Sequence, residues 1–375
     1  MKKENIGIIT FPVGKAGYIP TSNLVDILSS ISKDTFLITG NKGSDLAKEK
    51  TNIHIYNINH ERGPNAFIRI IRYIIIQLRI SNQLKKNSKN TRVWVFFTGG
   101  TLLIIPIIVA KVLRKKVVLV LSGSFYESFK SSNSFLTTSI NILENINRVL
   151  SDHIILYSDN LINEWNLKKF KNKISIASRH FLDFDTFRIK KKIEERKNLV
   201  GYIGRLSEEK GISSFIKSIP IAMKNIRDIE FLIVGDGDFN NEIKNFILTN
   251  NLSDRVKFIG WISHESIPEY LNELKLLIIP SYTEGLPNIL LEAMACGTPV
   301  LATPVGAIPD IIRDEETGFI LSENNPDTIA ENIKNILNNP NLFRIVDTAK
   351  NFVEKNYTFS ISVEKYEKII QEVLK

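Results

Sequence analysis

Short apolar runs recur along the whole chain and alternate with longer segments in which apolar residues have helical spacing. This alternation is typical of parallel α/β sheets. In the first half, the runs predicted as strands are 6–11, 35–39, 53–56, 93–97, 116–121 and 153–157. In the second half, they are 199–203, 230–234, 256–259, 276–279 and 299–302. The pattern therefore predicts two Rossmann-like domains, each built on a parallel sheet.

Length agrees with two domains, because 375 residues exceed the roughly 100–200 residues of an ordinary domain. The densely charged stretch 187–197 is expected to be an exposed linker between them. Residues 363–374 have the spacing of a terminal helix.

Composition is that of a soluble globular protein, with 43% hydrophobic and 24% charged residues. No apolar stretch approaches the ~20 residues of a membrane span, and the start lacks a signal-peptide cleavage pattern, so we expect a cytoplasmic location. Cys296 is the only cysteine, which excludes an internal disulfide and favours a small buried helix residue. The histidines show no metal-ligand spacing.

Charge is distributed unevenly between the two halves. Residues 1–185 hold 26 Lys and Arg against 13 Asp and Glu, whereas residues 186–375 hold 23 against 27. A basic half can bind nucleic acid, a membrane surface or an anionic substrate. Because no nucleic-acid-binding module is recognisable, nucleic acid is the least favoured of these partners.

The segment 281–300 predicts a strand-to-helix turn that carries two carboxylates. Glu284 falls on the turn and Glu292 on the following helix. Pro287 suits the first helical turn and Gly297 follows the last one, so both helix ends are marked. The free N–H groups at the start of such a helix can hold a phosphate.

This segment resembles the retaining glycosyltransferases of family 4, which have the GT-B fold and a "glycosyl transferases group 1" C-terminal domain. Four further segments match that family in order: 202–211, 231–237, 256–261 and 304–310. The resemblance implies two Rossmann-like α/β domains facing across a cleft. Residues 1–187 would form the acceptor-side domain and 188–356 the nucleotide-sugar-binding domain, with a helix in 357–375 packing back on the first.

The resemblance also implies roles for the charged residues. Arg205 and Lys210 would lie on a loop at the carboxyl edge of the sheet and neutralise the donor diphosphate as it leaves. Glu292 would accept hydrogen bonds from the ribose hydroxyls. Glu284 would lie beside the transferred sugar as the catalytic residue, where it could hold sugar hydroxyls, stabilise an oxocarbenium-like centre or act as a nucleophile.

Further contacts follow from the same resemblance. The backbones of Gly285, Leu286 and Pro287 would contact sugar or phosphate, and Trp261 falls near the place of the nucleotide base. In the first half, the loop containing Gly14 and Gly17 would approach the donor phosphate.

The first half departs from the family in two places. The adjacent glycine pair of the family's loop is missing beside Gly14 and Gly17, and Ser122, Gly123 and Ser124 stand where many relatives carry a histidine. The share of the first domain in catalysis therefore stays open at this point.

Two short motifs suggest other chemistry. Gly235 and Gly237 begin a dinucleotide fingerprint, but Asn240 replaces its third glycine, which argues against a dehydrogenase. The Asp-x-Asp triplets 183–185 and 236–238 are of a kind that binds a metal–nucleotide in the other major transferase fold. The GT-B resemblance favours transfer without a metal or cofactor.

We therefore expect a retaining, metal-independent glycosyltransferase of the hexosyltransferase class, which moves a sugar from a nucleotide diphosphate sugar to an acceptor hydroxyl. Envelope or extracellular polysaccharide or glycolipid synthesis would be its setting. The alternatives are a nucleotide-sugar epimerase of the same fold and an inactive transferase-like partner protein.

Residues 65–86 predict one helix with a basic stripe and an unusually wide apolar arc. The stripe collects Arg69, Arg72, Arg79, Gln83 and Lys86 and is interrupted by Ile76. Such a helix is either a core helix flanked by other helices or one that leans on an anionic membrane surface. The second reading suits a lipid-linked rather than a soluble saccharide acceptor and a peripheral location on the inner face of the membrane.

Overall fold

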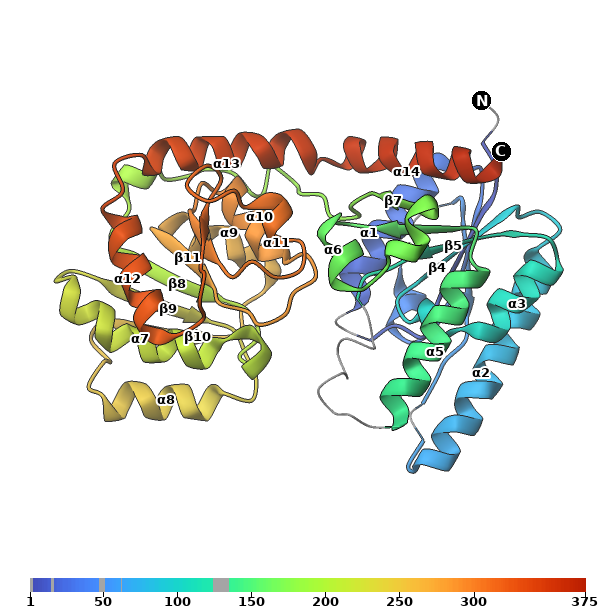
Figure 1. Cartoon of the computed structure of the whole chain (residues 1–375), viewed down its shortest axis with the longest axis horizontal. Helices are drawn as coiled ribbons and strands as arrows, with labels where there is room; N and C mark the ends of the chain where they lie inside the picture. Colours follow the sequence, from blue (N-terminus) through green and yellow to red (C-terminus); the bar gives the residue numbers. More distant parts are fainter. Residues whose placement is uncertain (1–2, 15–16, 47–50, 62, 124–134) are drawn as a thin grey trace. The chain divides into compact units, whose positions relative to one another are not determined.

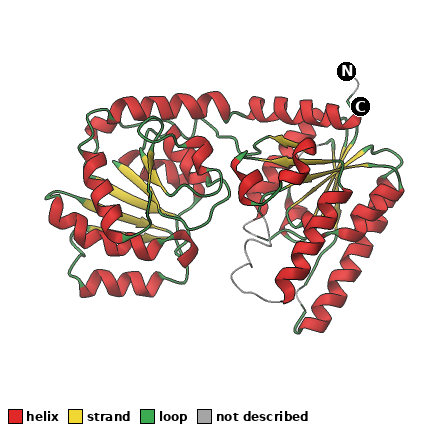
Figure 2. Ribbon diagram, in the orientation of Figure 1, coloured by secondary structure: helices red, strands yellow, loops and turns green. Residues whose placement is uncertain are grey.

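The computed structural model describes residues 3–14, 17–46, 51–61, 63–123 and 135–375. The chain divides into two compact units (Figure 1). Unit 1 comprises Met1–Phe181 and Phe359–Lys375, and unit 2 comprises Leu182–Thr358. Each unit has a parallel sheet covered by helices (Figure 2), which confirms the predicted fold class.

Unit 1 contains a seven-stranded parallel sheet with the order β3-β2-β1-β4-β5-β6-β7. Its strands are β1 Ile6–Thr10, β2 Thr35–Thr39, β3 Ile53–Asn57, β4 Val93–Phe97, β5 Lys116–Val120, β6 His153–Leu156 and β7 Ile174–Ile176. The first six follow the predicted runs closely. The short edge strand β7 was not predicted, because three half-buried residues give too little pattern.

The helices of unit 1 cover both faces of this sheet. They are α1 Tyr18–Ile31, α2 Ala66–Asn87, α3 Ile104–Val112, α5 Phe135–Leu150, α6 Asn160–Glu164 and α14 Phe359–Leu374, with 3-10 turns η2 Lys42–Asp45, η3 Gly100–Leu102 and η5 Lys168–Lys173. Helices α1 and α14 pack against each other and share one core with the sheet, while α2, α3 and α5 lie side by side (Figure 1). No helix in the described part of the chain is long and apolar enough to cross a bilayer.

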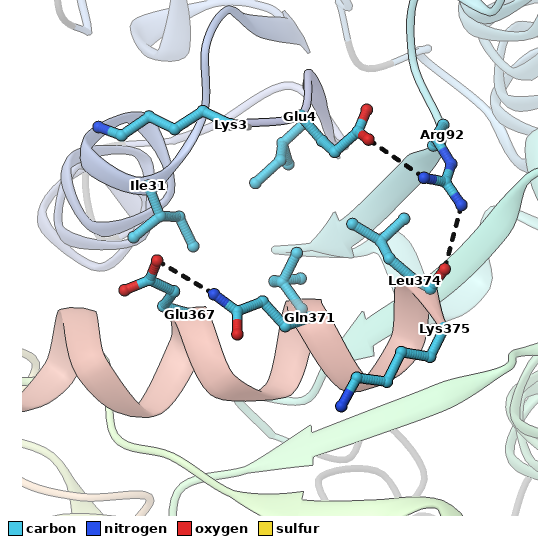
Figure 3. Close-up of a pocket in the computed structure, with 10 residues that line it drawn as sticks. Lys3, Glu4, Ile31, Arg92, Glu367, Gln371, Leu374 and Lys375 are labelled. Carbon is cyan, nitrogen blue, oxygen red and sulfur yellow. Dashed lines mark hydrogen bonds and ion pairs between the residues drawn. The ribbon is translucent and has the colours of Figure 1, made fainter. Parts of the chain in front are cut away.

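The C-terminal helix α14 completes unit 1, although residues 182–358 separate it from the rest of that unit. Tyr366 is fully buried in the core that α14 shares with α1. At the C-terminal end of α14, the Arg92 guanidinium donates to the Glu4 carboxylate at 3.1 Å and to the Leu374 carbonyl at 3.0 Å (Figure 3). These contacts join both ends of the chain to the start of β4.

Unit 2 contains a six-stranded parallel sheet with the order β10-β9-β8-β11-β12-β13. Its strands are β8 Leu199–Ile203, β9 Glu230–Val234, β10 Val256–Gly260, β11 Leu276–Ile279, β12 Val300–Ala302 and β13 Phe319–Ile320. Its helices are α7 Ile212–Asn225, α8 Asn240–Thr249, α9 Ile267–Glu273, α10 Asn288–Ala295, α11 Ile308–Ile311, α12 Pro326–Leu337 and α13 Leu342–Asn356, with 3-10 turns η6 Ile193–Glu195, η7 Glu208–Lys210 and η8 His264–Ser266. The two-residue strand β13 was not predicted.

The core of unit 2 lies between the sheet and the paired helices α7 and α12. Phe215 of α7 and Phe231 of β9 are completely buried there, with their rings 6.2 Å apart. Each fully buried side chain of this size stabilises the fold by about 1.5–3 kcal/mol. This core fixes the strands whose carboxyl ends carry the candidate site.

The expected exposed linker is partly buried, so that expectation was wrong for Arg196. This side chain is only 4% exposed. Its guanidinium donates to the carbonyls of Lys191, Leu271, Leu274 and Cys296 and to the Thr298 hydroxyl. Burial lowers the pKa of Arg196 to about 10, which leaves it charged at neutral pH. A buried charge is tolerated here because its N–H groups find acceptors.

The unit boundaries fall at 181/182 and 358/359, whereas the sequence analysis placed them at 187/188 and 356/357. The reason lies in the packing of the connecting segment. The Phe187 ring lies 5.4 Å from that of His264, and Ile189 packs against Gly297. Through these contacts, residues 182–187 and the residues that directly follow them pack as part of unit 2.

Candidate active site in unit 2

The strand order of unit 2 reverses at β8. From β8 the chain adds β9 and β10 on one side, then returns to place β11 on the other side. Open α/β sheets bind ligands outside the carboxyl ends of the strands at such a reversal. A cavity of about 300 Å³ lies at this point. The polar residues that line it include Arg205, Lys210, His264, Ser281, Glu284 and Glu292.

The loop after β8 brings Lys210 to the end of β11. Gly211 follows Lys210 with a φ of +69°, and a Cβ there would lie 1.8 Å from the Pro280 carbonyl oxygen. Only glycine combines this conformation with so close an approach. The Tyr282 N–H donates to the Glu209 carbonyl at 2.9 Å, which fastens the two loops together.

Lys210 and Glu284 form an ion pair, with 2.8 Å between Nζ and Oε1. The Ser281 hydroxyl donates to the same carboxylate oxygen at 2.7 Å. The Glu284 side chain is only 9% exposed, so water screens this pair weakly. The sequence analysis placed both residues near the donor, but it did not foresee that they contact each other.

The matched segment 304–310 supports the turn that carries Glu284. Gly306 has a φ of +61°, and a Cβ there would lie 2.3 Å from the Glu284 carbonyl oxygen. The Ala307 N–H donates to the Gly285 carbonyl at 2.9 Å. The backbone of the carboxylate turn is therefore held from the side of β12.

Arg205 lies at the mouth of the cavity and is 62% exposed. Its guanidinium is 3.5 Å from the Glu209 carboxylate, a loose pair, and its carbonyl accepts the Tyr202 hydroxyl at 2.6 Å. A long, exposed cation with so loose a partner can reorient toward an incoming anion. The hydrogen bond from the Tyr202 hydroxyl to the Arg205 carbonyl fixes the backbone position from which the guanidinium extends.

Glu292 projects from α10 and is only 3% exposed. His264 Nε2 lies 2.8 Å from its Oε1, and the imidazole is half-exposed. The hydrogen bond to Glu292 raises the pKa of His264 above its usual value near 6.5. This pairing was not predicted, because the spacing of the histidines indicates only whether they could bind a metal. The position of His264 after β10, at the same edge of the sheet, was the available signal.

The remaining predicted site residues of unit 2 differ in their placement. Pro287 lines the cavity and caps α10. Leu286 is buried, whereas Gly285 is partly exposed on the turn. Trp261 is 74% exposed and is not among the residues that line the cavity. Contacts of these residues with a ligand stay predictions.

Gly14 and Gly17 belong to unit 1, where the strand order reverses between β1 and β4. The Phe11 N–H donates to the Thr98 carbonyl at 3.0 Å, which joins the loops that follow these strands. Gly17 caps the start of α1. Lys15 and Ala16 between the two glycines, and Ser124 of the departing segment, lie outside the described residues.

In each Asp-x-Asp triplet, the first aspartate accepts hydrogen bonds from residues of its own turn. Asp183 accepts hydrogen bonds from the Asp185 N–H and the Thr186 hydroxyl. Asp236 accepts from the Gly237 N–H and from Asn240. In the part of the chain that the structure describes, no three His, Cys, Asp or Glu residues are grouped so as to hold a metal ion. Metal independence itself stays a prediction.

Cys296 ends α10 and is fully buried, as expected for a small core residue. Burial raises the pKa of its thiol to about 12. Because the thiolate is the reactive form, this cysteine has no role as a nucleophile at neutral pH.

Comparison with known proteins identifies this domain. Residues 183–359 match the family described as "Glycosyl transferases group 1". Unit 2 is a group 1 glycosyltransferase domain. The match covers nearly all of unit 2, including the cavity and the residues that line it.

Two curated relatives illustrate the resemblance. The alpha-D-kanosaminyltransferase of Streptomyces kanamyceticus is 29% identical over 204 residues, 53% of each chain. The capsular polysaccharide biosynthesis glycosyltransferase CapM of Staphylococcus aureus is 28% identical over 253 residues, 62% of this chain and 65% of the relative. The chain therefore aligns with about half to two thirds of the length of these relatives.

Similarity of fold extends over both units. The crystal structure of HepE from Anabaena in complex with UDP has a TM-score of 0.77 at 13% identity, covering 98% of this chain and 100% of HepE. At this identity the comparison establishes the fold, which is GT-B, for the whole chain.

The pair of His264 and Glu292 generates a first prediction. The folded state binds the His264 proton more tightly than the unfolded chain, so the pair stabilises the fold below pH 6.5 and this contribution is lost as pH rises through the raised pKa. Glu292→Gln should lower the pKa of His264, because it removes the charged acceptor. An NMR titration of the histidine rings measures this, with His54, in unit 1, as the control. An unchanged His264 pKa would contradict the pairing.

Proposed function

We propose that the protein is a retaining glycosyltransferase that moves a sugar from a nucleotide diphosphate sugar to an acceptor hydroxyl. The observation that carries the proposal is the convergence of two cations and two carboxylates in one cavity of a group 1 glycosyltransferase domain. These residues come from two separate segments of the chain, the loop after β8 and the turn and helix after β11. A structural role alone would not require them at the strand-order reversal where α/β sheets bind ligands.

In this proposal, the donor diphosphate lies between the loop after β8 and the start of α10. Arg205 and Lys210 neutralise its charge, and the first N–H groups of α10 add the positive end of the helix dipole. Lys210 already contacts Glu284, so it can bridge the phosphate and that carboxylate. HepE holds UDP in its crystal structure, which makes UDP the first nucleotide to test here.

Glu292 accepts hydrogen bonds from the ribose hydroxyls in the proposed complex. Because Glu292 is buried and its Oε1 is taken by His264, the ribose either displaces the imidazole or uses the other oxygen. A buried carboxylate binds neutral hydroxyl donors strongly, since water competes poorly for it.

The proposed chemistry transfers the sugar with retention and without a metal. The bond between the anomeric carbon and the phosphate oxygen breaks, and the acceptor oxygen forms the new bond on the same face. The acceptor proton passes to the leaving phosphate, and Glu284 lies beside the sugar as charge develops on it. The cationic loop lowers the cost of the charge that builds on the leaving diphosphate.

A second prediction concerns donor binding. Arg205→Ala or Lys210→Ala removes one charge-assisted contact to phosphate, worth about 1.5–3 kcal/mol. Titration calorimetry should show the affinity for UDP falling roughly tenfold or more for each variant. Lys217→Ala removes an exposed cation of α7 outside the cavity and is the matched control. Unchanged affinity in both cavity variants would refute the phosphate assignment.

A third prediction separates the two carboxylates. Glu292→Gln should weaken binding of free UDP, because it removes the charge from the acceptor for the ribose. Glu284→Gln should leave that affinity nearly unchanged and lower turnover. A chelator should alter neither quantity. A fully active Glu284→Gln variant would contradict its catalytic role.

Turnover assays distinguish the enzyme classes. Incubation with a panel of nucleotide sugars should release nucleoside diphosphate only when a suitable acceptor is added. Conversion of the sugar without any acceptor would instead indicate an epimerase. Nucleotide binding without any conversion across a broad acceptor panel would indicate an inactive partner protein.

The proposed acceptor is carried by a lipid, with α2 lying on an anionic membrane surface, and the setting is polysaccharide or glycolipid synthesis. Supporting this, α2 is covered on one face only. Ile76 and Ile80 are buried, whereas a row of apolar residues is 40–73% exposed: Phe67, Ile70, Ile71, Ile74, Ile75 and Leu78. Val112 of the neighbouring helix α3 is 74% exposed. The similarity to CapM supports the same setting.

A fourth prediction follows for membrane binding. The protein should bind acidic liposomes at low salt and dissociate as salt is raised, because each basic residue near the surface contributes about 1 kcal/mol and salt screens it. Changing Arg69, Arg72 and Arg79 together to Gln should reduce the bound fraction in a flotation assay. Equal binding to neutral and acidic vesicles, or none to either, would favour a soluble acceptor.

A further inference from the structure

A second cavity, of about 360 Å³, opens in unit 1 between α2 and the loop that follows β3. His60 and Glu61 line it from the loop, and Arg72, Ile75 and Arg79 line it from the helix. Arg72 and Arg79 are seven residues apart, so they project from the same side of α2 two turns from each other. Two guanidinium groups, one imidazole and one carboxylate thus border one space.

The positive charge of this cavity is only partly offset among the described residues, because Glu61 is the one carboxylate that lines it there. The Arg72 guanidinium donates to the backbone carbonyl of Glu61 at 3.0 Å. Arg79 has no carboxylate within ion-pair distance in that part of the chain, and the Glu61 carboxylate pairs with neither arginine. A solvent-exposed guanidinium such as that of Arg79 loses little free energy when it lacks an ion-pair partner. Two guanidinium groups beside one cavity nevertheless favour the binding of an anion there.

The wall that carries His60 is fixed by its own hydrogen bonds. The Asn41 side chain accepts from the His60 N–H at 3.0 Å and donates to the His60 carbonyl at 3.1 Å. The Asn59 side chain accepts from the Asn41 N–H at 3.0 Å. The Phe11 ring packs on the imidazole at 5.1 Å. This wall of the cavity is therefore fixed before any ligand arrives, which lowers the entropic cost of ordering it on binding.

An apolar stripe borders the cavity along α2. Ile75 lines the cavity and is itself 42% exposed. From there the stripe continues through Ile71, Ile74, Leu78 and Phe67, at the helical spacings that place them on one face. A small inorganic anion would use only the arginines, whereas a molecule with an anionic head and a hydrocarbon tail would use both features. Charge and apolar surface together select the second kind of ligand.

We propose that this cavity binds the phosphate or diphosphate head of an amphiphile whose hydrocarbon tail lies along the exposed face of α2. The planar guanidinium groups of Arg72 and Arg79 match phosphate oxygens in pairs, and the His60 ring supplies a further polar contact. The proposal deepens the proposed function, on which it rests for one point: the amphiphile would carry the acceptor sugar. Binding of the amphiphile by itself requires no turnover.

Farnesyl diphosphate, inorganic diphosphate and farnesol test the proposal on the full chain by titration calorimetry. Farnesyl diphosphate should bind at least tenfold more tightly than either inorganic diphosphate or farnesol, because only it presents both head and tail. Arg72→Gln with Arg79→Gln should weaken its binding at least tenfold. The matched control is Lys85→Gln with Lys89→Gln, which removes the same charge from exposed positions in the last turn of α2 and just after it and should leave binding unchanged.

Two comparisons locate the ligand. Leu78→Ser with Ile74→Ser should weaken binding of farnesyl diphosphate but not of inorganic diphosphate. The Arg205→Ala, Lys210→Ala variant removes the other candidate diphosphate site and should still bind farnesyl diphosphate. On binding, NMR signals of the His60 ring should shift, while those of His54, at the opposite end of β3, should not. A circular dichroism spectrum and a thermal unfolding midpoint at the wild-type values establish that each unit 1 variant is folded, and an unchanged UDP affinity shows that unit 2 is unaffected.

Each contrary outcome overturns either the amphiphile site or the proposed function. If the Arg72, Arg79 variant binds farnesyl diphosphate as tightly as wild type, the cavity is not the site. Equal affinities for inorganic and farnesyl diphosphate would reduce the site to one for a free phosphate compound. If amphiphile binding behaves as expected but no donor is turned over, the proposed function fails and the amphiphile site stands. If turnover is normal but the variants bind the amphiphile as wild type does, the amphiphile site fails and the proposed function stands.

Discussion

The reversal of strand order at β8 is the constraint on which the candidate active site depends. Parallel strands bring all their carboxyl ends to one edge, and the reversal leaves the loops after β8 and β11 without a helix packed between them. Lys210 and Glu284, 74 positions apart in the numbering, meet there at 2.8 Å. The glycine contacts of Gly211 and Gly306 show how closely the backbones approach at this edge. A side chain at either position would separate the loops and the charges that they carry.

Charge in the cavity of unit 2 is arranged as pairs in which one partner is mostly buried. Glu284 and Glu292 are both enclosed, and Lys210 and the half-exposed His264 face them from the solvent side. In the proposed complex, the phosphates of the nucleotide would meet these cations and its ribose hydroxyls would reach Glu292. The same physics explains why Arg205, which lacks a buried partner, stays at the mouth.

Unit 1 uses the same sheet architecture for a different surface. Helix α14 covers the face shared with α1, so that face is closed, whereas α2 keeps half of its apolar arc in contact with solvent. Arg69 and Arg72 of α2 donate to carbonyls of the loop after β3, while the apolar stripe stays exposed. The excess of positive charge in the first half of the sequence is thus concentrated, in part, beside an apolar surface, where amphiphiles and membranes supply matching chemistry.

The sequence alone determined the fold class and most strands, because buried parallel strands read as continuous apolar runs and turn glycines mark where they end. The family resemblance added several residues that the structure brings together around the cavity of unit 2. The strands 199–203 and 230–234 were predicted to the residue. Tertiary structure decided what no local pattern records. It buried Arg196 among carbonyls from distant segments, paired His264 with Glu292, joined Lys210 to Glu284 and opened the cavity at Arg72 and Arg79. The first three depend on contacts between residues far apart in the chain, and spacing along a sequence carries no information about them. The cavity depends on how the loop after β3 folds back on α2, which the helical spacing of Arg72 and Arg79 does not reveal.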